Sequence, residues 1–92
     1  MRAIGHNLKP IITIAEKGVN EAITAEIERA LNDHELIKIK INVNDPEYRK
    51  NLTSTLCTEH RSELVQAIGK VALIYRKAKK PNAKLSNLIR PL

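Results

Sequence analysis

The sequence predicts a two-layer α/β domain of the α+β type, with a four-stranded mixed sheet and helices on one face. Short β-branched runs alternate along the chain with longer segments whose apolar residues recur at helical spacing. The apolar residues are almost entirely Ile, Leu, Val and Ala, with no Phe or Trp. Ninety-two residues suffice for one such hydrophobic core and leave no room for a second.

The first half of the chain contains two predicted helices and two predicted strands. Residues 2–7 predict the last turns of a helix that ends before a proline, and residues 11–15 predict a short strand. Asn20 is a good cap for an amphipathic helix that continues to about residue 33. Residues 36–43 alternate and predict a strand with one buried face. Its inward positions are Ile37, Ile39, Ile41 and Val43.

The second half begins with a strong helix signal, because Asp45 can cap the helix and Pro46 suits its first position. One stripe of this helix is predicted to contain Tyr48, Leu52, Thr55, Leu56 and Glu59. Two apolar strands follow, and Gly69-Lys70 between them indicates a hairpin. The predicted order is helix, strand, helix, strand, helix, strand, strand. Strand-helix-strand units favour parallel pairing, and the hairpin adds an antiparallel edge.

The net charge of +6 lies at the C-terminal end of the chain. Residues 1–75 hold ten Lys and Arg against all ten Asp and Glu, so the excess lies in residues 76–92. We therefore predict one domain over residues 1–76 and a basic, flexible tail over residues 77–92. A basic tail on a balanced domain favours a polyanionic partner, although such a tail can also serve only solubility.

Three segments of this chain resemble a known family. They are HNLKP at 6–10, HELIKIK at 34–40 and IGKVALIYR at 68–76. In sequence and spacing they are similar to the CRM domain (chloroplast RNA splicing and ribosome maturation) in its bacterial stand-alone form, the YhbY-like proteins. The resemblance implies a fold like that of the C-terminal domain of translation initiation factor three. It also implies association with ribosomal RNA or large-subunit precursors during ribosome assembly.

The resemblance further implies RNA binding through basic surface and a Gly-x-x-Gly loop after the first strand. In this chain the loop is Ala15-Glu16-Lys17-Gly18, so only its last two residues match the basic and glycine positions. The predicted RNA-binding residues are Lys17, Gly18, Lys38, Lys40, Gly69, Lys70, Arg76, Lys77, Lys79 and Lys80. Structural alternatives exist for several of them: an ordinary turn at 15–18 or 69–70, and a solvated strand face at 38–40.

Catalysis and metal binding receive no support from the sequence. Cys57 and His60 offer two ligands at most, whereas structural zinc takes four, and a Cys-His nucleophile needs a third, orienting group. No cofactor or small-molecule substrate is expected. With only Tyr48 and Tyr75 as aromatics, and Tyr75 expected to be half-buried, RNA binding on aromatic platforms is disfavoured.

We therefore expect a non-catalytic RNA-binding protein, monomeric and without a membrane segment. The single thiol favours a cytoplasmic location. The main rival is a protein-interaction module that docks on an assembly factor or ribosomal protein through its amphipathic helices. A DNA-binding protein is disfavoured because strands separate the helices. An RNA-modifying enzyme is a more distant alternative.

Overall fold

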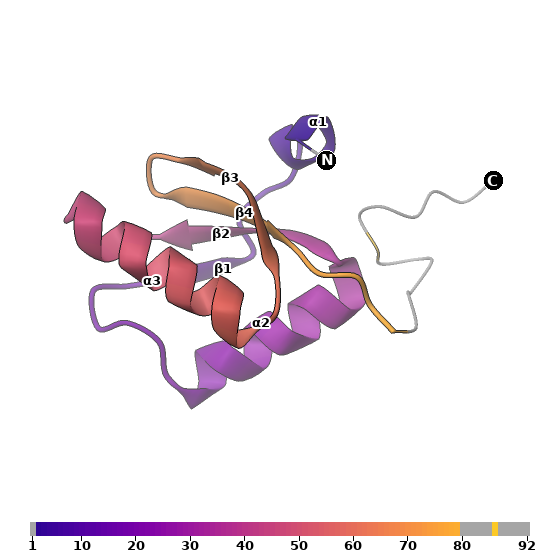
Figure 1. Ribbon diagram of the computed structural model, residues 1–92, viewed down its shortest axis with the longest axis horizontal. Helices are drawn as coiled ribbons and strands as arrows, with labels where there is room; N and C mark the ends of the chain where they lie inside the picture. The colour runs from indigo at the N-terminus through magenta and orange to yellow at the C-terminus, as the bar shows by residue number, and fades with distance from the viewer. Residues whose placement is uncertain (1, 80–85, 87–92) are drawn as a thin grey trace.

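The computed structural model describes residues 2–79 and Ser86, and its centre is a four-stranded mixed sheet (Figure 1). The strands are β1 (Ile12–Ile14), β2 (Leu36–Ile41), β3 (Glu63–Ile68) and β4 (Val71–Tyr75). β1 pairs in parallel with β2, and β4 pairs antiparallel with both β2 and β3. The predicted α+β class, mixed sheet and order of elements are confirmed.

The order of strands across the sheet is β1-β2-β4-β3, so the last strand lies inside. β3 has the same direction as β2 but is not its neighbour. The reason lies in composition: Ala72, Leu73 and Ile74 of β4 are all buried, so β4 needs cover on both faces. β3 includes Glu63 and Gln66 and is mostly exposed, as suits an edge strand. A shift in register between Leu64 and Gln66 adds a β-bulge there.

Two of the three helices, α2 (Glu21–His34) and α3 (Pro46–Glu59), lie over the same face of the sheet (Figure 1). The strand residues beneath them are apolar and fully buried. Ile27 and Leu31 of α2 and Leu56 of α3 complete this core, and Ile23 and Leu52 pack against it partly buried. The inward-facing set predicted for β2, with Val43 just beyond it, is confirmed. The core comprises Ile12, Ile14, Ile27, Ala30, Leu31, Ile37, Ile39, Ile41, Val43, Leu56, Ala72 and Ile74.

The short helix α1 (Arg2–His6) lies against the opposite face of the sheet. Leu73 of β4 points to this face, and its side chain lies so close to Gly5 that a Cβ there would sit 2.2 Å from Leu73 Cδ2. Both residues are buried. The expectation of helices on one face therefore holds for α2 and α3, while α1 protects an apolar residue on the other side.

Side-chain caps begin both long helices where the sequence predicts them. Asn20 Oδ1 accepts a hydrogen bond from the Ile23 amide at 2.9 Å, and Asp45 Oδ1 accepts one from the Glu47 amide at 3.1 Å. The predicted stripe of α3 is partly wrong. Its buried face is centred on Thr53 and Leu56, whereas Tyr48, Thr55 and Glu59 are exposed. Tyr48 lies in the first turn of α3, at the edge of this face, where it stays exposed.

The segment after β4 begins with residues that the body of the protein holds in place. Glu35, buried at the C-terminal cap of α2, accepts hydrogen bonds from the Ala78 amide at 3.0 Å and from Ser86 Oγ at 2.7 Å. Ala78 is buried as well. The predicted tail over 77–92 therefore has a packed start at Ala78 and a packed residue at Ser86. The flexibility predicted for the rest of the tail concerns residues 80–85 and 87–92, which lie outside the described residues.

Candidate nucleic-acid interface

The loop that follows β1 is a tight turn whose conformation depends on glycine at one position only. The Gly18 amide donates to the Ala15 carbonyl at 2.9 Å, and Gly18 has φ +82°. Only a glycine adopts that conformation without strain. Ala15 has no positive φ, so an alanine fits at the first position of the loop. The Glu16 carboxylate accepts the Asn44 amide at 3.0 Å, while Lys17 is exposed.

The tip of the β3–β4 hairpin lies next to the C-terminal end of β2. The Ile41 amide donates to the Lys70 carbonyl at 2.6 Å, and Lys40 pairs with Val71. The ammonium group of Lys70 donates to Asn44 Oδ1 at 3.0 Å and to Asn42 Oδ1 at 3.3 Å. These partners are neutral amides, so they orient the lysine without forming an ion pair with it.

Parallel pairing of β1 with β2 brings the loop and the hairpin tip to the same end of the sheet. The Asn42 amide donates to the Ile14 carbonyl at 2.7 Å, which links the two strand ends directly. We call this region the loop–hairpin end. Its members are Lys17, Gly18, Lys40, Asn42, Asn44, Gly69 and Lys70. Five of the ten residues predicted to bind RNA, including three lysines from three separate segments, thus lie in one region.

Besides Asn42 and Asn44, two residues next to the loop–hairpin end were not among those predicted to bind RNA. Tyr48 is 40% exposed, and its hydroxyl would lie 3.4 Å from a Cβ at Gly18, so this ring adjoins the loop. Arg49 donates from Nη1 to the Val43 carbonyl at 2.7 Å, which fixes its guanidinium beside the Asn42–Asn44 segment. Helical periodicity placed Tyr48 in one stripe with Leu52 and Leu56, which gave no reason to expect it at an RNA surface. The N-terminal position of both residues, directly after the Asp45 cap, was the available signal.

Lys38 lies on the same strand face as Lys40 but closer to α1. It is half-buried beside His6 and Pro10, and its carbonyl accepts the Ile11 amide at 3.0 Å. Lys40, two residues further along, is exposed. The predicted pair therefore shares one face, with Lys38 partly covered and Lys40 open at the loop–hairpin end.

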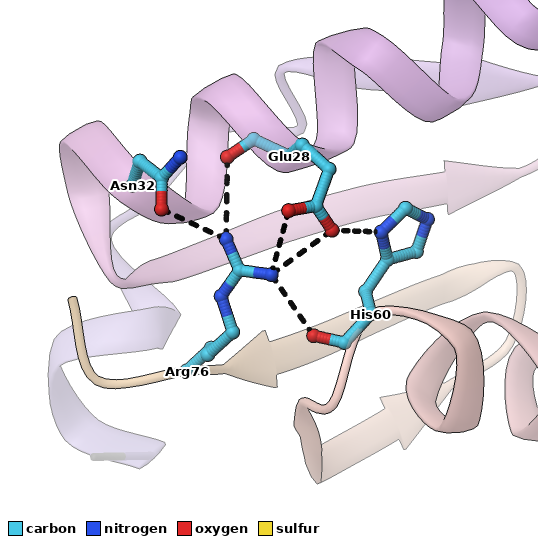
Figure 2. Close-up of polar contacts among 4 residues, drawn as sticks. All are labelled: Glu28, Asn32, His60 and Arg76. Carbon is cyan, nitrogen blue, oxygen red and sulfur yellow. Dashed lines mark hydrogen bonds and ion pairs between the residues drawn. The ribbon is translucent and has the colours of Figure 1, made fainter. Parts of the chain in front are cut away.

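Arg76 is oriented into the protein by a network that joins α2, α3 and β4 (Figure 2). Its Nη1 donates to both Glu28 carboxylate oxygens at 2.9 Å and to the His60 carbonyl at 3.0 Å. Its Nη2 donates to Asn32 Oδ1 at 2.9 Å, and the side chain is only 18% exposed. These contacts use most of its donors. RNA contact by Arg76 stays a prediction, and the geometry gives this residue a structural task.

Glu28 is the acceptor at the centre of this network. His60 Nδ1 lies 2.5 Å from Glu28 Oε2 and donates to it (Figure 2). This hydrogen bond holds the pKa of Glu28 below its ordinary value, and the hydrogen bonds and charge of Arg76 act in the same direction, while partial burial opposes them. Glu28 is therefore a carboxylate at neutral pH, and it neutralises Arg76 locally.

A second group of cations lies beside this network, in a cleft of about 630 Å³. Lys77 and Lys79 follow β4, and Arg61 comes from the turn between α3 and β3. All three side chains are exposed, and none has an ion pair within the described residues. Arg61 adopts φ +51°, which is uncommon for a residue with a side chain. We call these three residues the exit cluster; Lys80 lies outside the described residues.

The two basic regions lie toward opposite ends of the sheet. The Arg76 amide donates to the Glu35 carbonyl, just before β2 begins, whereas Lys40 lies near the end of β2. A strand of six residues spans roughly 20 Å. The predicted binding residues therefore form two regions, and Lys38 lies between them.

Cys57 and His60 contact different parts of the structure. Cys57 packs against the core, and burial raises the pKa of its thiol, whereas His60 caps α3 and donates to Glu28. Among the residues described, no three His, Cys, Asp or Glu side chains are grouped to hold a metal ion. Within the same residues, no helix has the length and apolar character needed to cross a membrane.

Comparison with known proteins gives consistent matches over most of the chain. The sequence profile of the CRS1 / YhbY (CRM) domain matches residues 1–76. A Pseudomonas aeruginosa protein named as a probable RNA-binding protein is 54% identical over 89 residues, covering 97% of this chain and 86% of that protein. A Haemophilus influenzae protein named as an RNA-binding protein is 33% identical over 85 residues, covering 92% of this chain and 86% of its own length.

A solved structure shares the fold. The solution structure of a hypothetical protein from Staphylococcus aureus is 40% identical and superimposes with a TM-score of 0.76. The match covers 86% of this chain and 82% of that one. The α+β architecture described above is therefore that of an experimentally determined relative.

Proposed function

Because the chain belongs to the CRS1 / YhbY (CRM) domain family, we propose that it is a non-catalytic RNA-binding protein. The observation that carries this proposal is the loop–hairpin end. Three lysines from distant segments lie at this end of the sheet, an exposed tyrosine adjoins its loop, and neutral amides orient Lys70. Such a surface attracts a polyanion and offers contacts to its phosphates.

The contacts expected at this surface are of two kinds. Lys17, Lys40 and Lys70 supply charge to phosphates, and counterion release then provides most of the affinity. Tyr48 supplies the exposed aromatic ring on which an unpaired base can stack. The names of the relatives in Pseudomonas and Haemophilus support RNA as the ligand.

The finer proposal is that the RNA is ribosomal, either mature or within precursors of the large subunit, and that the protein acts in ribosome assembly. The family resemblance supports this choice. We propose further that it acts as a monomer in the cytoplasm, with one thiol and no need for a disulfide.

Crosslinking in cells tests the finer proposal. The full chain is crosslinked to RNA, and the attached RNA is sequenced. The proposal predicts reads concentrated in large-subunit ribosomal RNA, and reads spread in proportion to total RNA abundance would contradict it. A binding assay with purified protein separates RNA binding from docking on a protein: a large-subunit RNA fragment should bind without any protein partner and should outcompete duplex DNA of equal length.

A further inference from the structure

A groove lies between α3 and the β3–β4 hairpin, on the face of the sheet that α3 covers. Its volume is about 490 Å³, within the range of small-ligand sites. α3 contributes small and polar side chains such as Thr53 and Cys57. The hairpin contributes Leu64, which is 48% exposed, and the small residues Ala67 and Ala72. Because Ala67 and Ala72 are small, they leave the space beneath α3 unfilled, and apolar surface of Leu64 stays exposed beside it.

The charged residues that line this groove are all cations. Arg49, Lys50 and Lys70 lie at the end nearest the hairpin tip, and no Asp or Glu is among the described residues that line it. The opposite end, near Cys57 and Leu64, has hydroxyl and apolar side chains. Arg49 and Cys57 are eight residues apart on one helix, or roughly 12 Å along its axis. The groove thus has a cationic end and a largely uncharged, apolar end.

We propose that this groove takes one or two unpaired nucleotides of a bound RNA, with the phosphates at the cationic end and the base between α3 and the hairpin. A nucleotide combines an anionic group with a flat, weakly polar body, which is the same combination that the groove presents. Bases outside a duplex are the parts of RNA that proteins insert into such sites. The inference rests on the proposed RNA binding and names the structural class of RNA preferred.

Continuity with the loop–hairpin end supports this assignment. Lys70 belongs to both surfaces. Arg49 lies between them, because its hydrogen bond to the Val43 carbonyl holds the guanidinium beside the loop–hairpin end. An RNA backbone held at Lys70 therefore passes the mouth of the groove. A chain with two tyrosines and no Phe or Trp can in this way distinguish unpaired from paired RNA through the groove as well as through stacking on Tyr48.

The sole cysteine provides a direct probe, because Cys57 lies toward the uncharged end. The rate at which iodoacetamide alkylates Cys57 is measured for the protein without RNA and with each of two RNA hairpins. The hairpins have equal numbers of nucleotides; one has a fully paired stem and the other a two-nucleotide bulge. With bulged RNA at roughly ten times its Kd, the rate should fall about tenfold, since only free protein reacts. The paired hairpin, bound by phosphates alone, should leave the rate unchanged.

A substitution that fills the groove provides a second, independent test of the proposal. Ala67→Ile puts a larger side chain into the groove, and Gln66→Ile on the opposite face of the same strand is the matched control. Wild-type protein and the control should prefer bulged over paired RNA by roughly five- to tenfold. Ala67→Ile should lose that preference and keep its affinity for paired RNA, which also shows that it is folded.

The outcomes separate this inference from the proposed function. Failure of the wild-type protein to bind either hairpin would overturn the proposed RNA binding. Equal affinity for both hairpins, with no protection of Cys57, would overturn the groove assignment and leave RNA binding intact. Protection of Cys57 by an acidic amphipathic peptide but by neither RNA would assign the groove to a protein partner and also overturn the inference.

Discussion

Arg76 and Glu28 lie 48 residues apart in the chain and form the ion pair that joins the exit of β4 to the middle of α2. Two hydrogen bonds of 2.9 Å connect Arg76 Nη1 to the carboxylate, and His60 at the end of α3 donates to the same group. Three elements thus share one carboxylate. The segment containing Lys77 and Lys79 leaves the sheet directly after this pair.

The network predicts that Arg76→Lys destabilises the protein despite keeping the charge. A lysine cannot reproduce the planar fork that contacts Glu28, Asn32 and the His60 carbonyl together. We expect the free energy of unfolding to fall by about 1–3 kcal/mol, measured by urea denaturation. A lysine variant as stable as wild type would show that only the charge of Arg76 matters.

The lowered pKa of Glu28 predicts acid sensitivity. A carboxylate whose pKa is lower in the folded state stabilises that state above the unfolded pKa and loses this effect as pH falls through the folded pKa. The relevant window therefore lies below about pH 4.3. Melting temperatures of wild type and Glu28→Gln should differ at neutral pH and converge as pH is lowered through this window. A difference that does not shrink anywhere in this window, down to the pH at which the protein unfolds in acid, would argue against the assignment.

The contact between α1 and the sheet predicts that Gly5→Ala is harmful even within a helix. The new methyl group would overlap the Leu73 side chain, which is itself buried and has little room to move. We expect a loss of about 1–3 kcal/mol, typical of overpacking, with faster hydrogen exchange in α1. Gly69→Ala is the control, because a Cβ at Gly69 meets nothing within 4 Å and the variant isolates the cost of a positive φ.

The separation of the two basic regions predicts a dependence on RNA length. Changing Arg61, Lys77 and Lys79 to Ala should weaken binding to an RNA long enough to span roughly 20 Å along the sheet. It should leave unchanged the binding of a much shorter RNA that reaches only the loop–hairpin end. Fluorescence anisotropy with RNAs of graded length measures this, and equal losses at every length would mean that the exit cluster is part of one continuous site.

Much of the fold follows from local patterns. The alternation at 36–43 identifies the buried face of β2, and Asn20 and Asp45 identify the helix starts, because each signal depends on neighbouring residues only. The insertion of β4 between β2 and β3 does not follow from such patterns. It depends on how well distant strands cover one another, and the bulge between Leu64 and Gln66 depends on the same pairing.

The candidate site was predictable in composition but not in arrangement. Lys17, Lys40 and Lys70 could be selected from their motifs, while their proximity results from the parallel pairing of β1 with β2. Arg76 belongs to the same motif as Lys70, yet it points inward because Glu28 and Asn32 lie across from it on α2. The predicted stripe of α3 that contains Tyr48 is offset by one position from the buried face at Thr53 and Leu56, because a helical stripe read from sequence is uncertain by one position at its edge.

The most direct measurement of the central claim is the salt dependence of RNA binding for two variants of equal charge. Lys17→Ala/Lys70→Ala removes two lysines of the loop–hairpin end, and Lys9→Ala/Arg29→Ala removes two exposed cations elsewhere. The first pair should lower the slope of log K against log salt by roughly one to two units, about one for each lost phosphate contact. The second pair should leave the slope close to that of wild type. Equal slopes for the two variants would contradict the claim that the loop–hairpin end holds the RNA backbone.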